Sequence, residues 1–167
     1  MKKIGITGQN GFVGKHLYNT LGLFPEEFQR VDFKKEYFEN ENQLDQFVVE
    51  CDVIIHLAAM NRHENEQFIY ETNVGLAQKL VDSLKRTNSK THVMISSSTQ
   101  EERDNLYGRS KREGRQALAN WAEENGGKMT GLIIPNVFGV FGRPFYNSFI
   151  ATFCHQLTHG ETPTIAN

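Results

Sequence analysis

Three evenly spaced glycines near the amino terminus constrain the fold of this chain more than any other feature. They lie in the run Thr7-Gly8-Gln9-Asn10-Gly11-Phe12-Val13-Gly14, which joins an apolar segment at residues 3–7 to an amphipathic segment. Glycine permits a tight turn at Gly8, a close approach of the backbone to a pyrophosphate at Gly11, and close packing of the following helix at Gly14. A helix that begins here directs its free N–H groups and the positive end of its dipole at an anion. The run therefore predicts a dinucleotide-binding turn made by Thr7, Gly8, Gly11, Phe12, Val13 and Gly14.

The rest of the chain alternates short apolar runs with amphipathic stretches. We expect strands at residues 3–7, 28–33, 52–58, 92–96 and 129–134, and helices around 13–21, 65–86, 107–124 and 148–157. Residues 34–50 are polar, so a further strand there is short or missing. This alternation predicts an α/β fold with a doubly wound parallel sheet in three α/β/α layers. The chain ends just after a helix, so we expect residues 1–167 to be one domain at the front of a longer protein.

Composition narrows the class of protein. The 167 residues are 38% hydrophobic and 23% charged, with a net charge of −2. Acidic and basic residues are interleaved, which gives no reason to expect a nucleic-acid or membrane partner. No apolar run is long enough to span a membrane. We interpret Cys51 and Cys154 as reduced thiols of the core, which fits a cytoplasmic enzyme.

An acidic residue about twenty positions after the glycine turn usually binds the adenosine ribose of a dinucleotide. Asp32 occupies that place and favours NAD. Lys34 and Lys35 follow at once, and either could pair with the 2′-phosphate of NADP or could simply be solvated. The residues themselves leave the choice of coenzyme open.

A second group of residues carries chemistry. The serines at 96–98 end a predicted strand, and Tyr107-Gly108-Arg109-Ser110-Lys111 opens a predicted helix. The i, i+4 spacing places Tyr107 and Lys111 on one helix face. A nearby ammonium group is expected to lower the pKa of the Tyr107 phenol, which is otherwise near 10. Ser98, in preference to Ser97, would orient a substrate oxygen while Tyr107 carries the proton of a hydride-transfer reaction.

With these residues the chain resembles the extended short-chain dehydrogenases, the NAD-dependent epimerase/dehydratase family, which have a Rossmann-like fold and act on nucleotide sugars. The resemblance rests on the glycine turn, the Tyr107–Lys111 pair and four further features: His56-Leu57-Ala58-Ala59, Asn73, the serine triplet and Pro135-Asn136-Val137-Phe138-Gly139. It implies that Asn73 completes a catalytic tetrad. It also implies coenzyme contacts from Leu57, Ala58, Ala59 and Pro135, and places Asn136 at the border of the nicotinamide and the sugar.

A narrower likeness is to reductases of capsular polysaccharide synthesis, carried by His56-Leu57-Ala58-Ala59-Met60-Asn61-Arg62, the short Ser98-to-Tyr107 spacing and residues 144–154. It implies reduction of a UDP-linked 4-keto-6-deoxy-acetamido sugar at C4 with NADPH, on the way to UDP-N-acetyl-L-fucosamine. It also implies a further substrate-binding part and a metal-binding, cupin-like epimerase domain, both absent from this chain. Asn61 and Arg62 could reach the substrate or belong to a plain loop. The alternatives are an epimerase or dehydratase of the same fold, or a dinucleotide-binding fragment without activity. A homodimer is possible.

The remaining polar and aromatic features have mostly structural interpretations. His56 is expected to be a core histidine, and no spacing of metal ligands is present. Basic residues of the Tyr107 helix and its approach could attract a nucleotide diphosphate, although we expect most of them to be solvated: Arg103, Arg109, Lys111, Arg112 and Arg115. We expect the aromatic side chains that follow the last strand to pack in a core: Phe138, Phe141, Phe145 and Phe149.

Overall fold

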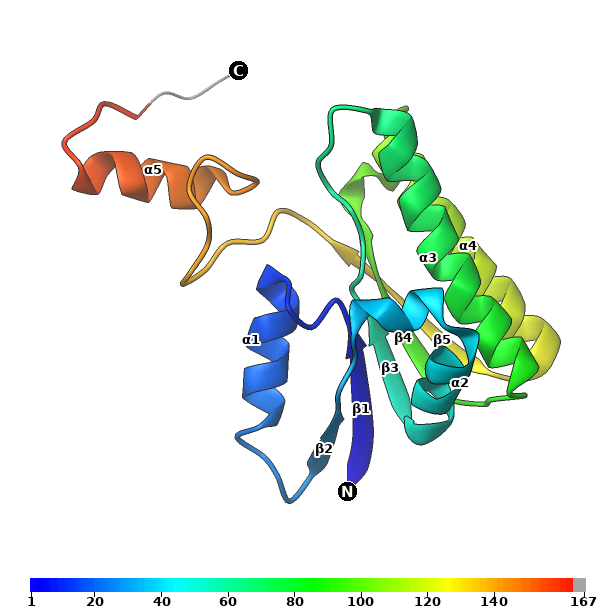
Figure 1. The fold of residues 1–167 in the computed structure, drawn as a ribbon. Helices are drawn as coiled ribbons and strands as arrows, with labels where there is room; N and C mark the ends of the chain where they lie inside the picture. Colours follow the sequence, from blue (N-terminus) through cyan, green and yellow to red (C-terminus); the bar gives the residue numbers. More distant parts are fainter. Residues whose placement is uncertain (164–167) are drawn as a thin grey trace. The chain divides into compact units, whose positions relative to one another are not determined.

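The computed structural model describes residues 1–163 (Figure 1). It contains the strands β1 (Lys2–Thr7), β2 (Phe28–Val31), β3 (Val53–His56), β4 (His92–Ser98) and β5 (Lys128–Ile134). Its α-helices are α1 (Phe12–Leu21), α2 (Glu41–Glu50), α3 (Glu66–Arg86), α4 (Leu106–Asn125) and α5 (Phe149–Thr158), with the 3₁₀ helices η1 (Lys35–Glu39) and η2 (Thr99–Glu102). Each predicted element is present, and the polar stretch at 34–50 forms η1 and α2 instead of a strand.

The five strands form one sheet in the order β2-β1-β3-β4-β5. The pairs β1–β2, β1–β3 and β3–β4 are parallel, and Thr7 lies opposite His56 in the register of β1 and β3. The connection after β1 leads outward to β2, whereas the connection after β2 returns to β3 on the other side of β1. The strand order therefore reverses at β1 and β3, where open α/β sheets bind their ligands at the carboxyl ends of the strands.

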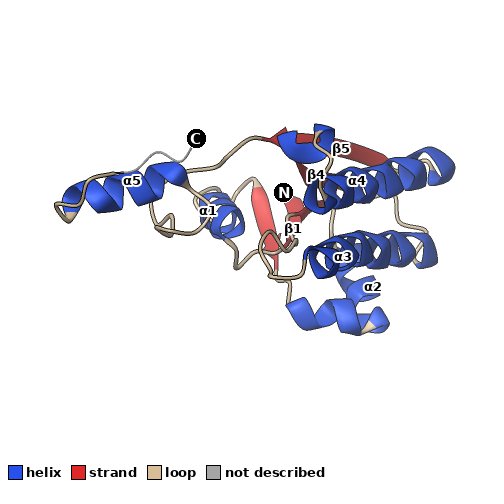
Figure 2. Ribbon diagram, turned by 90° about the horizontal axis from the view of Figure 1, so that it is seen from above, coloured by secondary structure: helices blue, strands red, loops and turns tan. Residues whose placement is uncertain are grey.

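Helices cover both faces of this sheet, which confirms the predicted three layers. In the view of Figure 2, α1 lies on the opposite side of β1 from α3 and α4. The smaller core, beneath α1, contains Ile4, Ile6 and Leu21. The larger core lies beneath α2, α3 and α4 and includes the fully buried Leu80, Leu84, Leu118 and Trp121. Burying a large apolar side chain contributes about 2 kcal/mol, so the larger core dominates the stability of the sheet.

Side-chain caps fix where several helices begin. Asn65 accepts hydrogen bonds from the backbone of Gln67 and Phe68 at the start of α3, and Asn105 accepts from Gly108 at 2.7 Å at the start of α4. Such caps satisfy backbone donors that the helix leaves unpaired. At the other end of α4, Gly126 adopts a left-handed conformation with φ +63°. A residue with a Cβ would be strained there, so the helix stops at the predicted place.

The chain divides into two compact units, Met1–Ile133 and Ile134–Asn167. In the second unit, two predictions are wrong. Cys154 is exposed, whereas Cys51 is buried as expected. The four aromatic side chains after β5 are also exposed: Phe138, Phe141, Phe145 and Phe149. Both predictions assumed that these residues face a core, but α5 has no buried residue.

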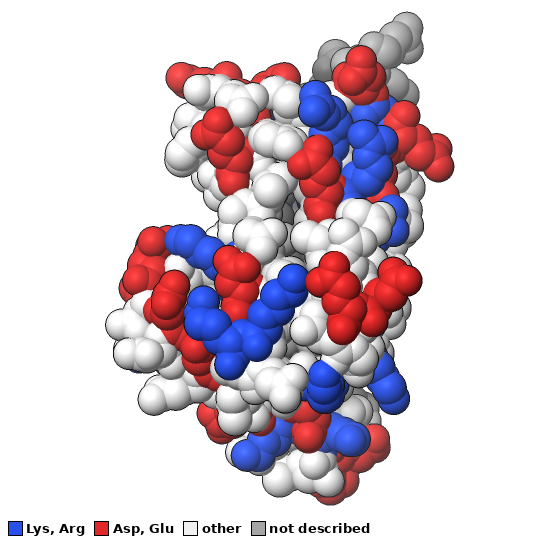
Figure 3. All heavy atoms as spheres, turned by 90° about the vertical axis from the view of Figure 1, so that its right-hand side faces the viewer, with Lys and Arg blue, Asp and Glu red and all other residues white. Residues whose placement is uncertain are grey.

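Charged side chains of both signs are interleaved on the face seen in Figure 3, without a patch of a single sign. Within residues 1–163, no helix is long and apolar enough to cross a membrane.

Candidate active site

The glycine turn forms a close-packed loop between β1 and α1. Gly8 has φ +77°, and a Cβ there would lie 2.8 Å from the backbone nitrogen of Ala58. A Cβ on Gly14 would lie 2.2 Å from the carbonyl oxygen of Gly8, so this glycine lets the helix pack against the turn itself. Gly11 is the N-cap of α1, and because it has no side chain, the backbone donors of the first turn are not capped by it. A Cβ is thus excluded at Gly8 and Gly14, and the first turn of α1 can direct its backbone donors at an anion.

The end of β2 carries the predicted ribose ligand, Asp32. Its side chain is exposed and accepts a hydrogen bond of 2.6 Å from the hydroxyl of Tyr18, which raises the pKa of Tyr18. The guanidinium of Arg30 lies 4.3 Å from the centre of the Tyr18 ring. The backbone nitrogen of Phe33 donates to Gln9 in the glycine turn at 3.1 Å. The turn and the end of β2 therefore form one connected edge of the sheet.

Ser98 and Tyr107 come together at the carboxyl end of β4. Ser98 Oγ accepts from the backbone nitrogen of Gln100 at 3.2 Å, and its hydroxyl acts on the Tyr107 phenol, where it lowers the pKa. Ser97 instead donates to the carboxylate of Glu101. The preference for Ser98 over Ser97 agrees with this geometry.

The expectation that Lys111 lowers the pKa of Tyr107 below its ordinary value is wrong. Burial raises the pKa of Tyr107 above its ordinary value, and the hydrogen bond from Ser98 only partly offsets that effect. Burial also lowers the pKa of Lys111 to about 8, with the charge of Glu101 acting in the opposite direction. Lys111 Nζ donates to Ser96 Oγ at 3.5 Å. The sequence could give the spacing of the pair but not its burial, and desolvation dominates here.

Asn73 lies near this group without touching the phenol. Its amide oxygen accepts from the backbone nitrogen of Met60 at 2.7 Å, and its amide nitrogen donates to the Met60 carbonyl and to Ser110 Oγ at 2.9 and 3.1 Å. Ser110 in turn donates to the Tyr107 carbonyl at 2.7 Å. Asn73 thus joins α3, α4 and the loop after β3, and it reaches Tyr107 through Ser110.

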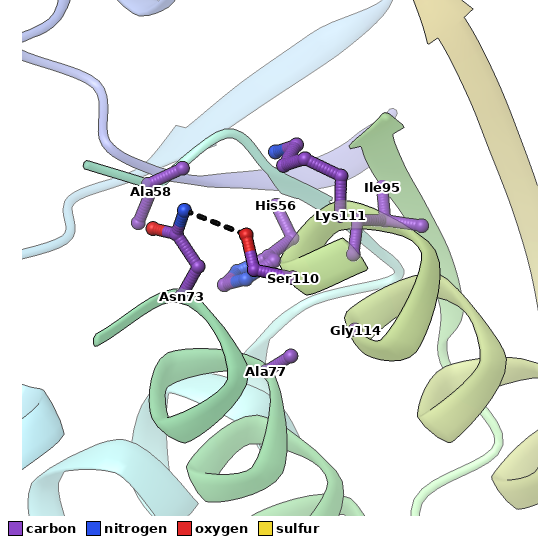
Figure 4. Close-up of a pocket in the computed structure, with 9 residues that line it drawn as sticks. His56, Ala58, Asn73, Ala77, Ile95, Ser110, Lys111 and Gly114 are labelled. Carbon is purple, nitrogen blue, oxygen red and sulfur yellow. Dashed lines mark hydrogen bonds between the residues drawn. The ribbon is translucent and has the colours of Figure 1, made fainter. Parts of the chain in front are cut away.

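A small pocket lies among these residues (Figure 4). It has a volume of about 10 Å³, room for roughly one water molecule. The lining residues include His56, Asn73, Ser110 and Lys111. His56 is 3% exposed, and its Nδ1 forms a hydrogen bond of 2.8 Å with Thr7 Oγ1. Burial lowers its pKa to about 3, so it is a neutral core histidine, as expected.

The other predicted ligands lie in two places. Leu57, Ala58 and Ala59 follow β3 beside the glycine turn, and Ala58 N donates to Thr7 Oγ1 at 3.4 Å. Asn61 and Arg62 are exposed further along the same loop. Pro135 and Asn136 belong to the second unit, so their places beside the nicotinamide and the sugar stay predictions.

The sequence analysis did not single out two residues of this site, Ser110 and Glu101, and did not predict that Arg115 pairs with Glu101. Ser110 stands inside the Tyr107-to-Lys111 motif, and its position there is the signal that could have found it. The interpretation of the basic residues as solvated is correct for Arg103, Arg109 and Arg112. It is wrong for Lys111, which is buried, and for Arg115, which pairs with Glu101. Among residues 1–163, no cluster of three metal-ligating side chains is present.

The fold and the glycine turn define a Rossmann-like nucleotide-binding domain. A curated relative from Pseudomonas aeruginosa, a UDP-2-acetamido-2,6-beta-L-arabino-hexul-4-ose reductase, is 35% identical over 159 residues, which is 93% of this chain and 41% of the relative. Residues 4–167 match the NAD dependent epimerase/dehydratase family. The chain belongs to that family, which confirms the predicted resemblance.

Solved structures agree with this assignment. The capsular polysaccharide assembling protein CapF from Staphylococcus aureus superimposes with a TM-score of 0.78 at 33% identity, over 100% of this chain and 44% of that protein. RMD from Pseudomonas aeruginosa, complexed with NADPH, shares the fold with a TM-score of 0.82 at 19% identity, over 96% of this chain and 63% of that protein. The chain spans about two fifths of the length of its curated relative and of CapF.

Proposed function

We propose that this chain is the coenzyme-binding and catalytic part of an NAD(P)H-dependent nucleotide-sugar reductase. The observation that carries the proposal is the convergence of Ser98, Tyr107 and the buried Lys111 at the carboxyl end of β4, the same edge of the sheet as the glycine turn. The 35% identity to a UDP-sugar reductase supports a substrate of that class, a UDP-linked 4-keto-6-deoxy-acetamido sugar reduced at C4. The product would serve as a precursor of capsular polysaccharide.

The residues of the turn fit a nicotinamide dinucleotide. Side chains at Gly8 and Gly14 would fill the space against Ala58 and the turn, and the start of α1 offers backbone donors for the pyrophosphate. Asp32 would bind the adenosine ribose, and Lys111 the nicotinamide ribose. When bound, the reduced coenzyme supplies a hydride. The resemblance to the capsular reductases favours NADPH, whereas Asp32 favours NADH. Fold neighbours are complexed with NADPH, NADP or NAD, so a fluorescence titration with each coenzyme decides between them.

The states of the protein's own groups suit reduction. A reduction needs a proton donor, and the raised pKa of Tyr107 keeps its phenol protonated at neutral pH. Ser98 would donate a hydrogen bond to the carbonyl oxygen, and Tyr107 would transfer its proton to that oxygen as the alkoxide forms. The ammonium of Lys111, charged below about pH 8, would stabilise the phenolate that remains.

Tyr107→Phe tests this function. Consumption of NADPH with a UDP-4-keto-acetamido sugar should fall at least 1,000-fold or so, because the proton donor is removed while the ring is retained. NADPH binding should change little. An unchanged rate contradicts the mechanism. Sugar conversion without net NADPH consumption would identify an epimerase instead, and NADPH binding without turnover of any sugar nucleotide would identify a binding fragment.

The proposed location is the cytoplasm, and the proposed homodimer is tested by light scattering.

A further inference from the structure

Glu101 is the one buried carboxylate of residues 1–163, with 7% of its surface exposed. It lies in η2, inside the short segment that joins Ser98 to Tyr107. A buried carboxylate is costly unless opposite charges or donors surround it. The contacts of Glu101 therefore show what this segment is organised around.

Three parts of the site meet at this side chain. Arg115 Nε donates to Glu101 Oε1 at 2.9 Å, and Arg115 Nη2 donates to Oε2 at 2.7 Å, so the pair is bidentate. Ser97, next to Ser98, donates to Glu101 Oε1. Arg112 Nη1 approaches the Glu101 carbonyl at 3.4 Å. One carboxylate thus connects the end of β4, the segment at 99–105 and α4.

The arginine of the pair lies directly beyond Lys111. Tyr107, Lys111 and Arg115 are spaced i, i+4 and i+8 along α4, so they share one helix face. The segment at 99–105 also packs closely on α4 at Gly108, where a Cβ would lie 2.0 Å from the Gln100 carbonyl oxygen. A shift of the Glu101–Arg115 pair would move Ser98 relative to Tyr107.

We infer that Glu101 and Arg115 are positioning residues that hold the short segment onto α4 and so keep Ser98 against Tyr107. Glu101 additionally favours the charged form of Lys111. The inference rests on the proposed function, because it assigns the pair to the same reaction. Glu101 acts through Ser97 and Lys111, and Arg115 acts through Glu101.

The charges around Lys111 agree with this role. Glu101 from η2 raises the pKa of Lys111, against the lowering by burial. The other polar groups near Lys111 are the neutral His56 from β3, Ser96 from β4, Asn73 from α3 and Ser110 from α4. Tyr107 and Arg115 lie four residues before and after Lys111 on the same helix. Removing the charge of Glu101 would also leave Arg115 unpaired one turn away from Lys111. Both changes favour the neutral amine.

A titration of Lys111 tests the inference without any substrate. In the full chain labelled with ¹³C-lysine, the Lys111 signal, assigned with Lys111→Arg, should titrate near pH 8. Glu101→Gln should lower this midpoint by about one pH unit, and Arg115→Gln should raise it, because Glu101 then acts on Lys111 alone. Glu101→Asp should restore most of the wild-type value. The matched control is Glu124→Gln, which removes the acid of an exposed ion pair on the same helix.

Activity gives a second readout. In Glu101→Gln, kcat should fall about ten-fold while the KM for NADPH stays within about three-fold, and the alkaline limb of the rate should move to lower pH. Equal Lys111 midpoints in the wild type, Glu101→Gln and Arg115→Gln would overturn the inference. If Glu101→Gln fails to fold, the direction of the Arg115→Gln shift decides alone. A wild type without turnover would refute the proposed function, whereas the titration would still test the pair.

Discussion

At the scale of a single residue, burial of the Lys111 ammonium lowers the free energy of unfolding. Lys111 is 8% exposed, and its pKa is lowered from 10.5 to about 8 because burial disfavours the ammonium. The unfolded chain therefore binds more protons than the folded one between pH 8 and 10.5, so the free energy of unfolding rises with pH across that window. Below pH 8 the full cost of burying the charge is present, about 3 kcal/mol.

Lys111→Met should accordingly stabilise the fold while it abolishes reduction. We expect the free energy of unfolding at pH 7 to increase by about 1–3 kcal/mol, because an apolar chain of similar length replaces a buried ammonium. This increase should shrink between pH 8 and 10.5, because Lys111 of the wild type loses its proton there and no longer buries a charge. Urea denaturation at pH 7 and pH 9.5 measures both effects.

The control for this change is Lys85→Met, since Lys85 is an exposed lysine in an ion pair with Glu124. It should alter the free energy of unfolding by no more than about 0.5 kcal/mol at either pH. A Lys111→Met protein that is less stable than the wild type at pH 7 would contradict the electrostatic account.

Several residues of the site could be predicted because their roles follow from local spacing. The glycines of the turn, the Tyr107–Lys111 pair and the serine at the end of β4 all belong to patterns that span a few residues. Glu101 and Arg115 are 14 residues apart and meet only because η2 folds back onto α4. The pKa of Tyr107 depends on its burial, which no local pattern contains. Local spacing therefore predicts the candidate reacting groups, whereas their electrostatic surroundings follow only from the fold.

At the scale of an element, the turn between β1 and α1 depends on glycine for contact more than for flexibility. Gly14→Ala would place a methyl group 2.2 Å from the Gly8 carbonyl oxygen and 2.8 Å from Gln9 Cα. Both neighbours are backbone atoms, so the whole turn must move. We expect the Kd for NADPH, measured by fluorescence titration, to rise at least ten-fold or so, because the backbone donors lose their arrangement.

Gly75→Ala is the matched control. Gly75 lies within α3, and a Cβ there meets no atom within 4 Å. The substitution should stabilise the helix by about 0.5–1 kcal/mol and leave NADPH binding unchanged. If Gly14→Ala bound NADPH as tightly as Gly75→Ala does, the turn would not be the site of the pyrophosphate.

Elements could also be located from sequence, within about two residues at most boundaries. The predicted strand at 92–96 continues to Ser98 in the structure. Ser97 and Ser98 are polar but buried, so a pattern of apolar residues does not reveal that the strand includes them. The predicted strands at 28–33 and 52–58 are shorter in the structure, at Phe28–Val31 and Val53–His56. Residues at the carboxyl ends of these strands leave the ladder and enter the loops that form the site.

At the scale of the whole molecule, the stabilising cores belong to the first unit. Every buried residue of both apolar clusters lies within residues 4–121, and Met129 of β5 packs at the margin of the larger cluster. The second unit supplies α5, which has exposed apolar side chains and no buried residue. Apolar burial drives folding, so the first unit carries most of the free energy of unfolding.

A chain that ends after Ile134 should therefore fold by itself. We expect a single cooperative urea transition, with a free energy of unfolding within about 1 kcal/mol of that of the full chain, since none of residues 135–163 is buried. The Kd for NADPH should change less than about three-fold if the turn and Lys111 dominate binding, and more if Pro135 contacts the nicotinamide as the family resemblance implies. A shortened chain without a cooperative transition would show that residues 135–167 complete a core, and would refute the division of stability argued from the two clusters.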